Sequence, residues 1–108
     1  MSLLDQLKED LKSAMRDRDE ARVNTIRSLI SSIDNAGAVP VETGPYEVKV
    51  GLDHDVERSI VTEGQMRSLV LAERDELLRA ADEYRDLGLD PKADELEGRA
   101  AIVTGYLR

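Results

Sequence analysis

The only histidine of the chain, His54, lies between two aspartates in the segment Leu52-Asp53-His54-Asp55. An aspartate can orient an imidazole for general acid–base catalysis. Neighbours within one loop rarely reach the geometry of a catalytic triad, however, and no glycine-flanked elbow serine accompanies them. The chain has no cysteine, which excludes thiolate nucleophiles, disulfides and the usual zinc frameworks. We therefore interpret His54 as a solvated loop residue and predict no catalytic residue.

A second group that could do chemistry is acidic and lies between residues 63 and 87. A di-iron helical bundle would need Glu-x-x-His pairs from two helices, and the sequence contains none. Arginines alternate with the acids, so that Glu76–Arg79 and Asp82–Arg85 form i,i+3 pairs, which are typical of an exposed, salt-bridged helix face. We predict a solvated face, with no metal and no cofactor. The acids are Glu73, Asp75, Glu76, Asp82, Glu83 and Asp86.

Basic residues form the third group, and they could contact RNA phosphates. Lys8, Lys12 and Arg16 recur every four residues, and Arg27 follows in the next predicted helix, where its stem could also cover the edge of the core. Residues 1–27 hold six basic and six acidic side chains, so the row is not a net-positive surface. No Walker loop or G-x-G-x-x-G motif is present. The four basic residues are our candidates for RNA contact.

Length and charge limit the class of protein further. A chain of 108 residues fits one small domain. With 15 Lys and Arg against 23 Asp and Glu, its net charge of −8 argues against broad binding to DNA or to an anionic membrane. Three Tyr, with no Phe or Trp, leave few rings on which bases could stack. The first residues lack a basic region followed by an apolar run, so we expect a cytoplasmic protein without a signal peptide or membrane span.

Apolar residues recur at helical spacing in four segments. Short turns join the first to the second and the third to the fourth, which makes each pair antiparallel. Amphipathic helices must bury their apolar sides together. We therefore predict an all-α fold in one domain, residues 1–108, with two antiparallel helical hairpins forming a small bundle. The predicted helices cover about residues 3–16, 19–36, 63–87 and 91–107.

Capping signals and apolar stripes define these helices. Ser2 and Asp5 form a short capping box, and Thr62 and Gln65 form a full one. Gly88 is predicted to end the third helix in a left-handed conformation. The residues expected on the buried stripes of the first three helices are Leu4, Leu7, Leu11, Met15, Val23, Ile26, Leu29, Ile30, Ile33, Met66, Leu69, Val70, Leu77, Ala81 and Tyr84.

The turns and the last helix carry further expectations. Asp17 or Asp19 can cap the second helix, and Asp90 can cap the fourth. Two glycines weaken the fourth helix, so its end should fray unless something covers it. Its apolar residues form a heptad seam that could face the other helices or a second copy of the chain, which leaves a homodimer open. The seam residues are Ala93, Leu96, Ala100, Val103 and Leu107.

The middle of the chain, residues 38–61, breaks the helical pattern with Pro and Gly. Val48 and Val50 alternate with charged residues as a strand would, and Val39 and Val41 could pair with them in a small hairpin. An isolated hairpin is marginal in water. The alternative is an irregular extended arm, either packed on the helices or mobile.

The order of several motifs resembles the GatB/YqeY family. The similar parts are AM-x-x-R-D at residues 14–19, Arg27 within IRSLISSI, and an EY-x-x-L-G turn at residues 83–88 followed by a helix ending in Tyr106-Leu107. They cover about three quarters of the chain. The resemblance implies an all-helical fold related to the tail of the B subunit of the glutamine-dependent tRNA amidotransferase. In that enzyme the tail is thought to help hold tRNA rather than to perform the chemistry.

Two departures from the family pattern bear on function. Family members usually continue beyond a Tyr-Leu-Pro into a second small helical domain, whereas this sequence reads Tyr106-Leu107-Arg108, so we expect a short form. The family's third helix also tends to be rich in Lys and Arg where this one is acidic. The leading hypothesis is a noncatalytic interaction domain whose partner is a protein or a protein–RNA complex. The second is a weakly tRNA-binding accessory to amidotransferase or to other translation machinery. Carbon–nitrogen ligase activity would rest on the family label alone, since no nucleophile, ATP site or glutaminase site is evident.

Overall fold

The computed structural model describes residues 1–37 and 61–108, and every regular element within them is helical. This confirms the predicted all-α class. The elements are α1 (Leu3–Arg16), α2 (Glu20–Gly37), α3 (Glu63–Asp86), α4 (Asp90–Thr104) and a 3₁₀-helix, η1 (Gly105–Leu107). The predicted strand hairpin of the middle segment and the environment of His54 lie outside the described residues.

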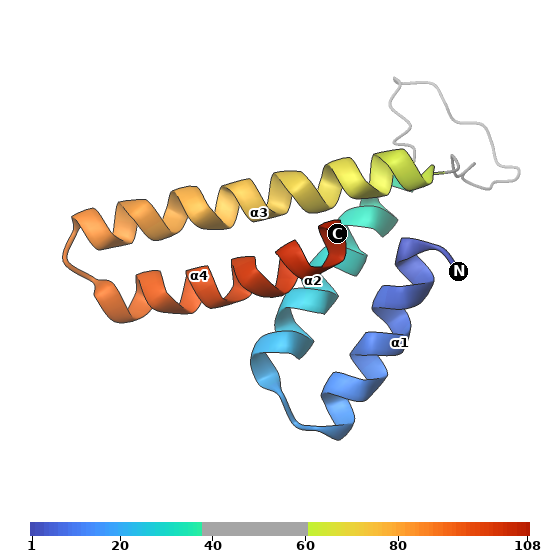
Figure 1. Ribbon diagram of the computed structural model, residues 1–108, viewed down its shortest axis with the longest axis horizontal. Coiled ribbons are helices and arrows are strands. Elements are labelled where there is room, and N and C mark those ends of the chain that lie inside the picture. Colours follow the sequence, from blue (N-terminus) through green and yellow to red (C-terminus); the bar gives the residue numbers. More distant parts are fainter. Residues whose placement is uncertain (38–60) are drawn as a thin grey trace, which may run out of the picture.

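The helices form two antiparallel hairpins, α1–α2 and α3–α4, as predicted (Figure 1). The second hairpin is the longer one, and its outer half projects beyond α2. Helix α2 packs against both α3 and α4, and α1 contacts α3. The α1–α2 hairpin therefore covers only the inner part of the α3–α4 hairpin.

Both predicted capping boxes are present. The N–H of Asp5 donates to Ser2 Oγ (3.1 Å) and the N–H of Ser2 to Asp5 Oδ2 (3.3 Å). At the start of α3 the N–H of Gln65 donates to Thr62 Oγ1 (3.1 Å) and the N–H of Thr62 to Gln65 Oε1 (2.9 Å). Each box satisfies backbone donors that a helix start leaves without partners.

Helix boundaries differ slightly from the predictions at several points, and α2 also ends one residue later than predicted, at Gly37. Helix α2 begins at Glu20, because Asp19 is its cap and accepts from the N–H of Arg22 (3.2 Å). Helix α3 ends at Asp86, one residue earlier than predicted. The predicted cap of α4 is wrong, because Leu89 takes the cap position without a side-chain hydrogen bond and Asp90 is already helical. The fourth helix also changes to 3₁₀ geometry after Thr104, inside the predicted range.

The core draws side chains from all four helices. Its largest fully buried apolar members are Leu7 of α1, Ile26 and Leu29 of α2, Val70 of α3 and Val103 of α4. The heptad seam of α4 is buried within the chain through Ala93, Leu96, Ala100 and Val103, and only Leu107 is half-buried. The sequence left two arrangements open for the seam. In the described residues the seam faces the other helices of the same chain.

Polar contacts join the two hairpins. The N–H of Leu3 donates to the carboxylate of Glu63 (2.9 Å), so a residue of α3 satisfies an unpaired donor at the start of α1. The guanidinium Nε of Arg99 donates to Thr25 Oγ1 (3.2 Å), and Thr25 is the buried polar residue of α2. Apolar contacts are not directional, so these hydrogen bonds help to fix the position of one hairpin relative to the other.

The C-terminal turn is held by the rest of the fold. The hydroxyl of Tyr106 donates to Asp10 of α1, and Arg67 of α3 donates to the carbonyl of Leu107 (2.7 Å). Burial of the hydroxyl, together with the hydrogen bond and the charge of Asp10, raises the pKa of Tyr106 above its ordinary value of 10.0. The end of the fourth helix therefore has the cover that its glycines require.

Candidate docking groove between the first two helices

The turn between α1 and α2 consists of Asp17, Arg18 and Asp19. The N–H of Arg18 donates to the carbonyl of Met15 (3.2 Å), and the N–H of Asp19 donates to the carbonyl of Ala14 (3.0 Å). This pair of bonds is the Schellman arrangement, which usually places glycine where Arg18 stands. Arg18 has a left-handed backbone, with φ of 57°. Such a conformation costs a residue with a side chain about 1 kcal/mol.

Arg18 lies beside a surface hollow of about 600 Å³ between the two helices. Met15, which is 51% exposed, forms part of its wall, so the prediction that Met15 is buried is wrong. The reason is that α1 turns Leu3, Leu7 and Ala14 to the core, which places Met15 beside the buried stripe instead of on it. The residues lining the hollow are Met15, Arg18, Glu20, Val23, Asn24 and Arg27.

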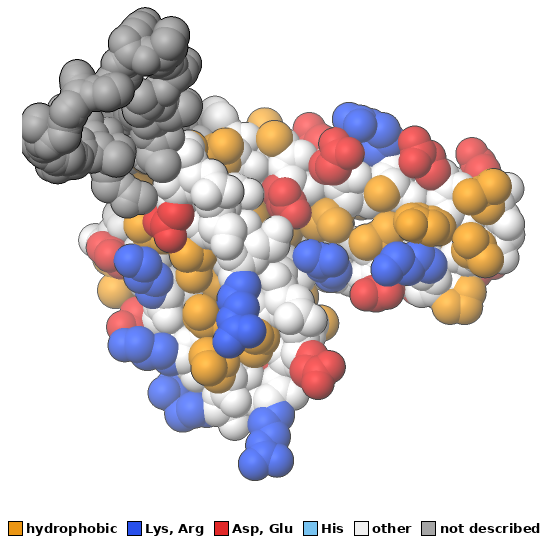
Figure 2. Space-filling model, turned by 180° about the vertical axis from the view of Figure 1, so that it is seen from behind, with side chains coloured by type: hydrophobic (Ala, Val, Ile, Leu, Met, Phe, Trp, Pro, Cys, Tyr) orange, Lys and Arg blue, Asp and Glu red, His pale blue; other side chains and the backbone are white. Residues whose placement is uncertain are grey.

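The hollow continues the seam between α1 and α2. Leu11 precedes Met15 by one helical turn and Ile30 follows Val23 by two turns, so each pair shares a helix face, and Leu11, Val23 and Ile30 are all half-buried. Figure 2 shows hydrophobic side chains over this hairpin, with both basic and acidic side chains beside them. We call the hollow, together with the half-buried residues Leu4, Leu11 and Ile30 that share its helix faces, the α1–α2 groove.

The structure separates the four predicted RNA-contact residues into two sets. Lys8, Lys12 and Arg16 are exposed along α1 and lie outside the lining of the hollow, and Lys12 pairs with Glu9 at 3.7 Å. Arg27 is exposed and lines the hollow. Lys8 stands three residues before Leu11, which places it on the rim of the α1–α2 groove.

Sequence reasoning predicted only Arg27 among the residues that line the hollow and missed Met15, Arg18, Glu20, Val23 and Asn24 as site residues. One signal could have identified Arg18: it lies between two helix stretches in a turn with no glycine, so some residue with a side chain had to take the left-handed position. No comparable signal marks Met15, because its exposure depends on which face of α1 meets α2 and α3.

The predicted acidic face of α3 is exposed except at Glu73, which is half-buried and accepts a hydrogen bond from Ser28 of α2 (3.4 Å), and one predicted ion pair is wrong. Arg79 pairs with Glu76 at 3.2 Å. Arg85 does not pair with Asp82. Its guanidinium group lies instead 3.0 to 3.6 Å from three carboxylates of α4. They belong to Asp90, Asp94 and Glu97. In the part of the chain that the structure describes, no three His, Cys, Asp or Glu residues cluster as metal ligands would.

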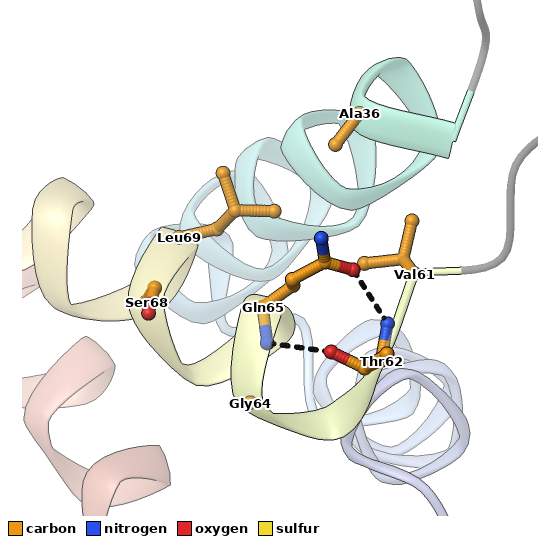
Figure 3. Close-up of a pocket in the computed structure, with 7 residues that line it drawn as sticks. All are labelled: Ala36, Val61, Thr62, Gly64, Gln65, Ser68 and Leu69. Carbon is orange, nitrogen blue, oxygen red and sulfur yellow. Dashed lines mark hydrogen bonds between the residues drawn. The ribbon is translucent and has the colours of Figure 1, made fainter.

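A second hollow, of about 550 Å³, lies where α2 ends and α3 begins (Figure 3). Its polar side chains are largely occupied, because Thr62 and Gln65 bond to each other's backbone in the capping box. Ser68 supplies a hydroxyl, and none of the lining side chains is a base that could activate it. This hollow offers shape but little chemistry. It is lined by Ala36, Val61, Thr62, Gly64, Gln65, Ser68 and Leu69.

Compared with protein-family models, with curated proteins and with solved structures, the chain matches none of them. Among the helices of residues 1–37 and 61–108, none is both long enough and apolar enough to cross a membrane.

Proposed function

We propose that this chain is a noncatalytic helical interaction domain of the GatB/YqeY type, whose partner, a protein or a protein–RNA complex, docks in the α1–α2 groove. One observation carries the proposal. Met15, Arg18 and Arg27 belong to motifs that are separate in the sequence, and they line a single hollow on the surface. Side chains from two helices that line one exposed hollow can contact a single partner together.

The chemistry of the hollow supports binding rather than catalysis. Its side chains are two guanidinium groups, one amide, one carboxylate and two apolar groups. Guanidinium groups stay protonated, so they bind and orient an anion but do not take up a proton. Glu20 is the only lining residue that could act as a base, and no hydroxyl or thiol lines the hollow beside it. We therefore assign the groove a docking role.

The energetic cost of this arrangement also supports a docking role. Arg18 keeps a left-handed backbone, and Met15 leaves half of its surface in water. A left-handed backbone at a residue with a side chain is a strain that proteins often retain at functional sites. The proposal places the domain in the cytoplasm, in keeping with a sequence that lacks cysteine.

The second candidate function is that of a tRNA-binding accessory to the glutamine-dependent amidotransferase or to translation. The cations along α1, together with Arg27, favour it. Salt-titrated binding of total tRNA tests it. The expected signature is a loss of affinity, and a shallower salt slope, when Lys8, Lys12 and Arg16 are all replaced by Ala. An unchanged affinity and slope would remove this candidate.

Capture from native extract tests the leading proposal. The wild-type chain, Met15→Asp and Leu87→Asp are immobilised, and the retained proteins are quantified. Leu87 is the matched control, because it is 71% exposed at the tip of the other hairpin. We expect a partner that the wild type and Leu87→Asp retain and Met15→Asp loses. The same set on all three chains would contradict the proposal.

A further inference from the structure

We infer that the α1–α2 groove binds an amphipathic α-helix whose apolar stripe is flanked by Asp and Glu. The inference rests on the proposed docking function and names the chemistry of its partner. Two antiparallel helices leave a lengthwise groove, and a third helix can fill it by ridges-into-grooves packing. Helix α1 has 14 residues, so a partner helix of about four turns, roughly 21 Å, would match it.

The floor of the groove is aliphatic. Leu11, Val23 and Ile30 are half-buried and Met15 is exposed, and these side chains can pack against Leu, Ile or Met of a partner. Methionine adapts to varied apolar surfaces, which makes it common at helix-binding sites. No aromatic residue occurs in residues 1–37, so bases would find no ring to stack on. The floor therefore favours a helix over a nucleic acid.

Several carboxylates of the hairpin make contacts away from the hollow, whereas Glu20 and Asp34 form no hydrogen bond or ion pair with another described residue. The carboxylate of Asp5 accepts from the N–H of Ser2 in the capping box of α1, Asp19 caps α2, and Asp10 accepts from the hydroxyl of Tyr106. Asp17 pairs with Arg22 at 3.8 Å. A carboxylate that accepts a hydrogen bond keeps its charge, so the excess of positive charge is confined to the hollow, where cations outnumber acids.

The rim cations complete the inference. Lys8, Arg16 and Arg18 form no ion pair with another described residue, and Arg18 and Arg27 both line the hollow. Guanidinium groups bind carboxylates through paired hydrogen bonds. Glu20 also lines the hollow, so the cations outnumber the acids there by two to one. A partner helix with acids beside its apolar stripe would satisfy both the floor and the rim.

The test selects ligands for the full chain from a phage-displayed library of helical peptides, with recovery also measured on Met15→Asp. We expect enriched peptides to carry apolar residues at i, i+3, i+4 and i+7, with Asp or Glu on both sides. Met15→Asp should weaken the best peptide at least about tenfold, because it puts a carboxylate on the floor. Arg18→Gln with Arg27→Gln should also weaken it about tenfold, through lost charged hydrogen bonds. Leu87→Asp should stay within about twofold.

Four results would overturn the inference. The first three are enrichment of basic or unpatterned peptides, equal affinity of the selected peptide for the wild type and Met15→Asp, and no enrichment at all. The fourth is competition between total tRNA and the selected peptide for the groove, which would assign the rim to phosphates instead. Failure here leaves the capture experiment intact: a partner lost only from Met15→Asp would keep the docking function and reject the acidic helix.

Discussion

Arg18 and Gly88 hold the same position in the same helix-ending turn. In each hairpin the residue after the C-cap has a left-handed backbone, with φ of 57° at Arg18 and 79° at Gly88. Each donates to a carbonyl three residues back, and the following residue donates to a carbonyl five residues back. Gly88 thus adopts this geometry without strain in one hairpin, whereas Arg18 adopts it at an energetic cost in the other.

Replacing Arg18 by glycine and replacing Gly88 by alanine should change the stability of the fold in opposite directions. Arg18→Gly removes the left-handed cost and should raise the free energy of unfolding by about 1 kcal/mol, and Gly88→Ala should lower it by a similar amount. Urea denaturation of both variants measures the changes. Arg18→Gly should also bind the groove's partner more weakly, which is the usual trade between stability and function. A stability loss in Arg18→Gly would show that its side chain supports the fold.

Tyr106 should make stability fall at alkaline pH. Burial and Asp10 raise its pKa in the folded chain, so its stabilisation is complete below the unfolded pKa of about 10 and is lost as pH rises above it. At about pH 8, Tyr106→Phe should cost about 1 kcal/mol by leaving Asp10 without its donor. The difference between wild type and variant should shrink toward about pH 11. A constant difference in urea denaturation at both pH values would contradict this account.

Arg85 should stabilise the outer end of the α3–α4 hairpin through its three carboxylate partners on α4. Arg85→Gln should lower the thermal midpoint at low salt, and the loss should diminish at about 1 M salt, where exposed charges are screened. Arg79→Gln is the matched control, because Arg79 pairs only within α3 among the described residues. Equal losses in the two variants would show that the cross-helix network adds nothing.

Thr25 should help to fix the two hairpins together. Thr25→Val keeps the side-chain shape but removes the acceptor for Arg99, and we expect a loss of about 1 kcal/mol in the free energy of unfolding. Thr104→Val is the control, since its hydroxyl bonds to the carbonyl of Ala100 within α4 and joins no two helices. Chemical denaturation compares the two. A larger loss in the control would mean that the hairpins need no polar tie.

Local signals predicted the helices well because they act within a few residues. The capping boxes at Ser2 and Thr62 and the glycine at position 88 perform the roles expected of them. One local signal failed where the hydrogen bonds of a turn decide where the helix begins. Asp90 is not the cap of α4. In the turn at Gly88 the N–H of Leu89 donates to the carbonyl of Tyr84, and the helix begins one residue earlier than predicted.

The candidate site was harder to predict than the fold. Apolar spacing put Met15 on the buried stripe, and only the packing of α1 on its neighbours shows that it faces the groove. Net charge likewise gave no sign of the local excess of cations at the hollow, where the fold brings Arg18 and Arg27 together beside one carboxylate, that of Glu20. A sequence lists charges, whereas the fold decides which of them remain available to a partner.

The most direct test of the docking groove is the affinity of the captured partner for three chains, measured by calorimetry. The wild type and Leu87→Asp should bind equally, and Met15→Asp should bind at least about tenfold more weakly, as expected when one apolar contact of 1.5–3 kcal/mol is lost. Equal affinity of Met15→Asp and the wild type would contradict the account, because the partner would then bind elsewhere on the molecule.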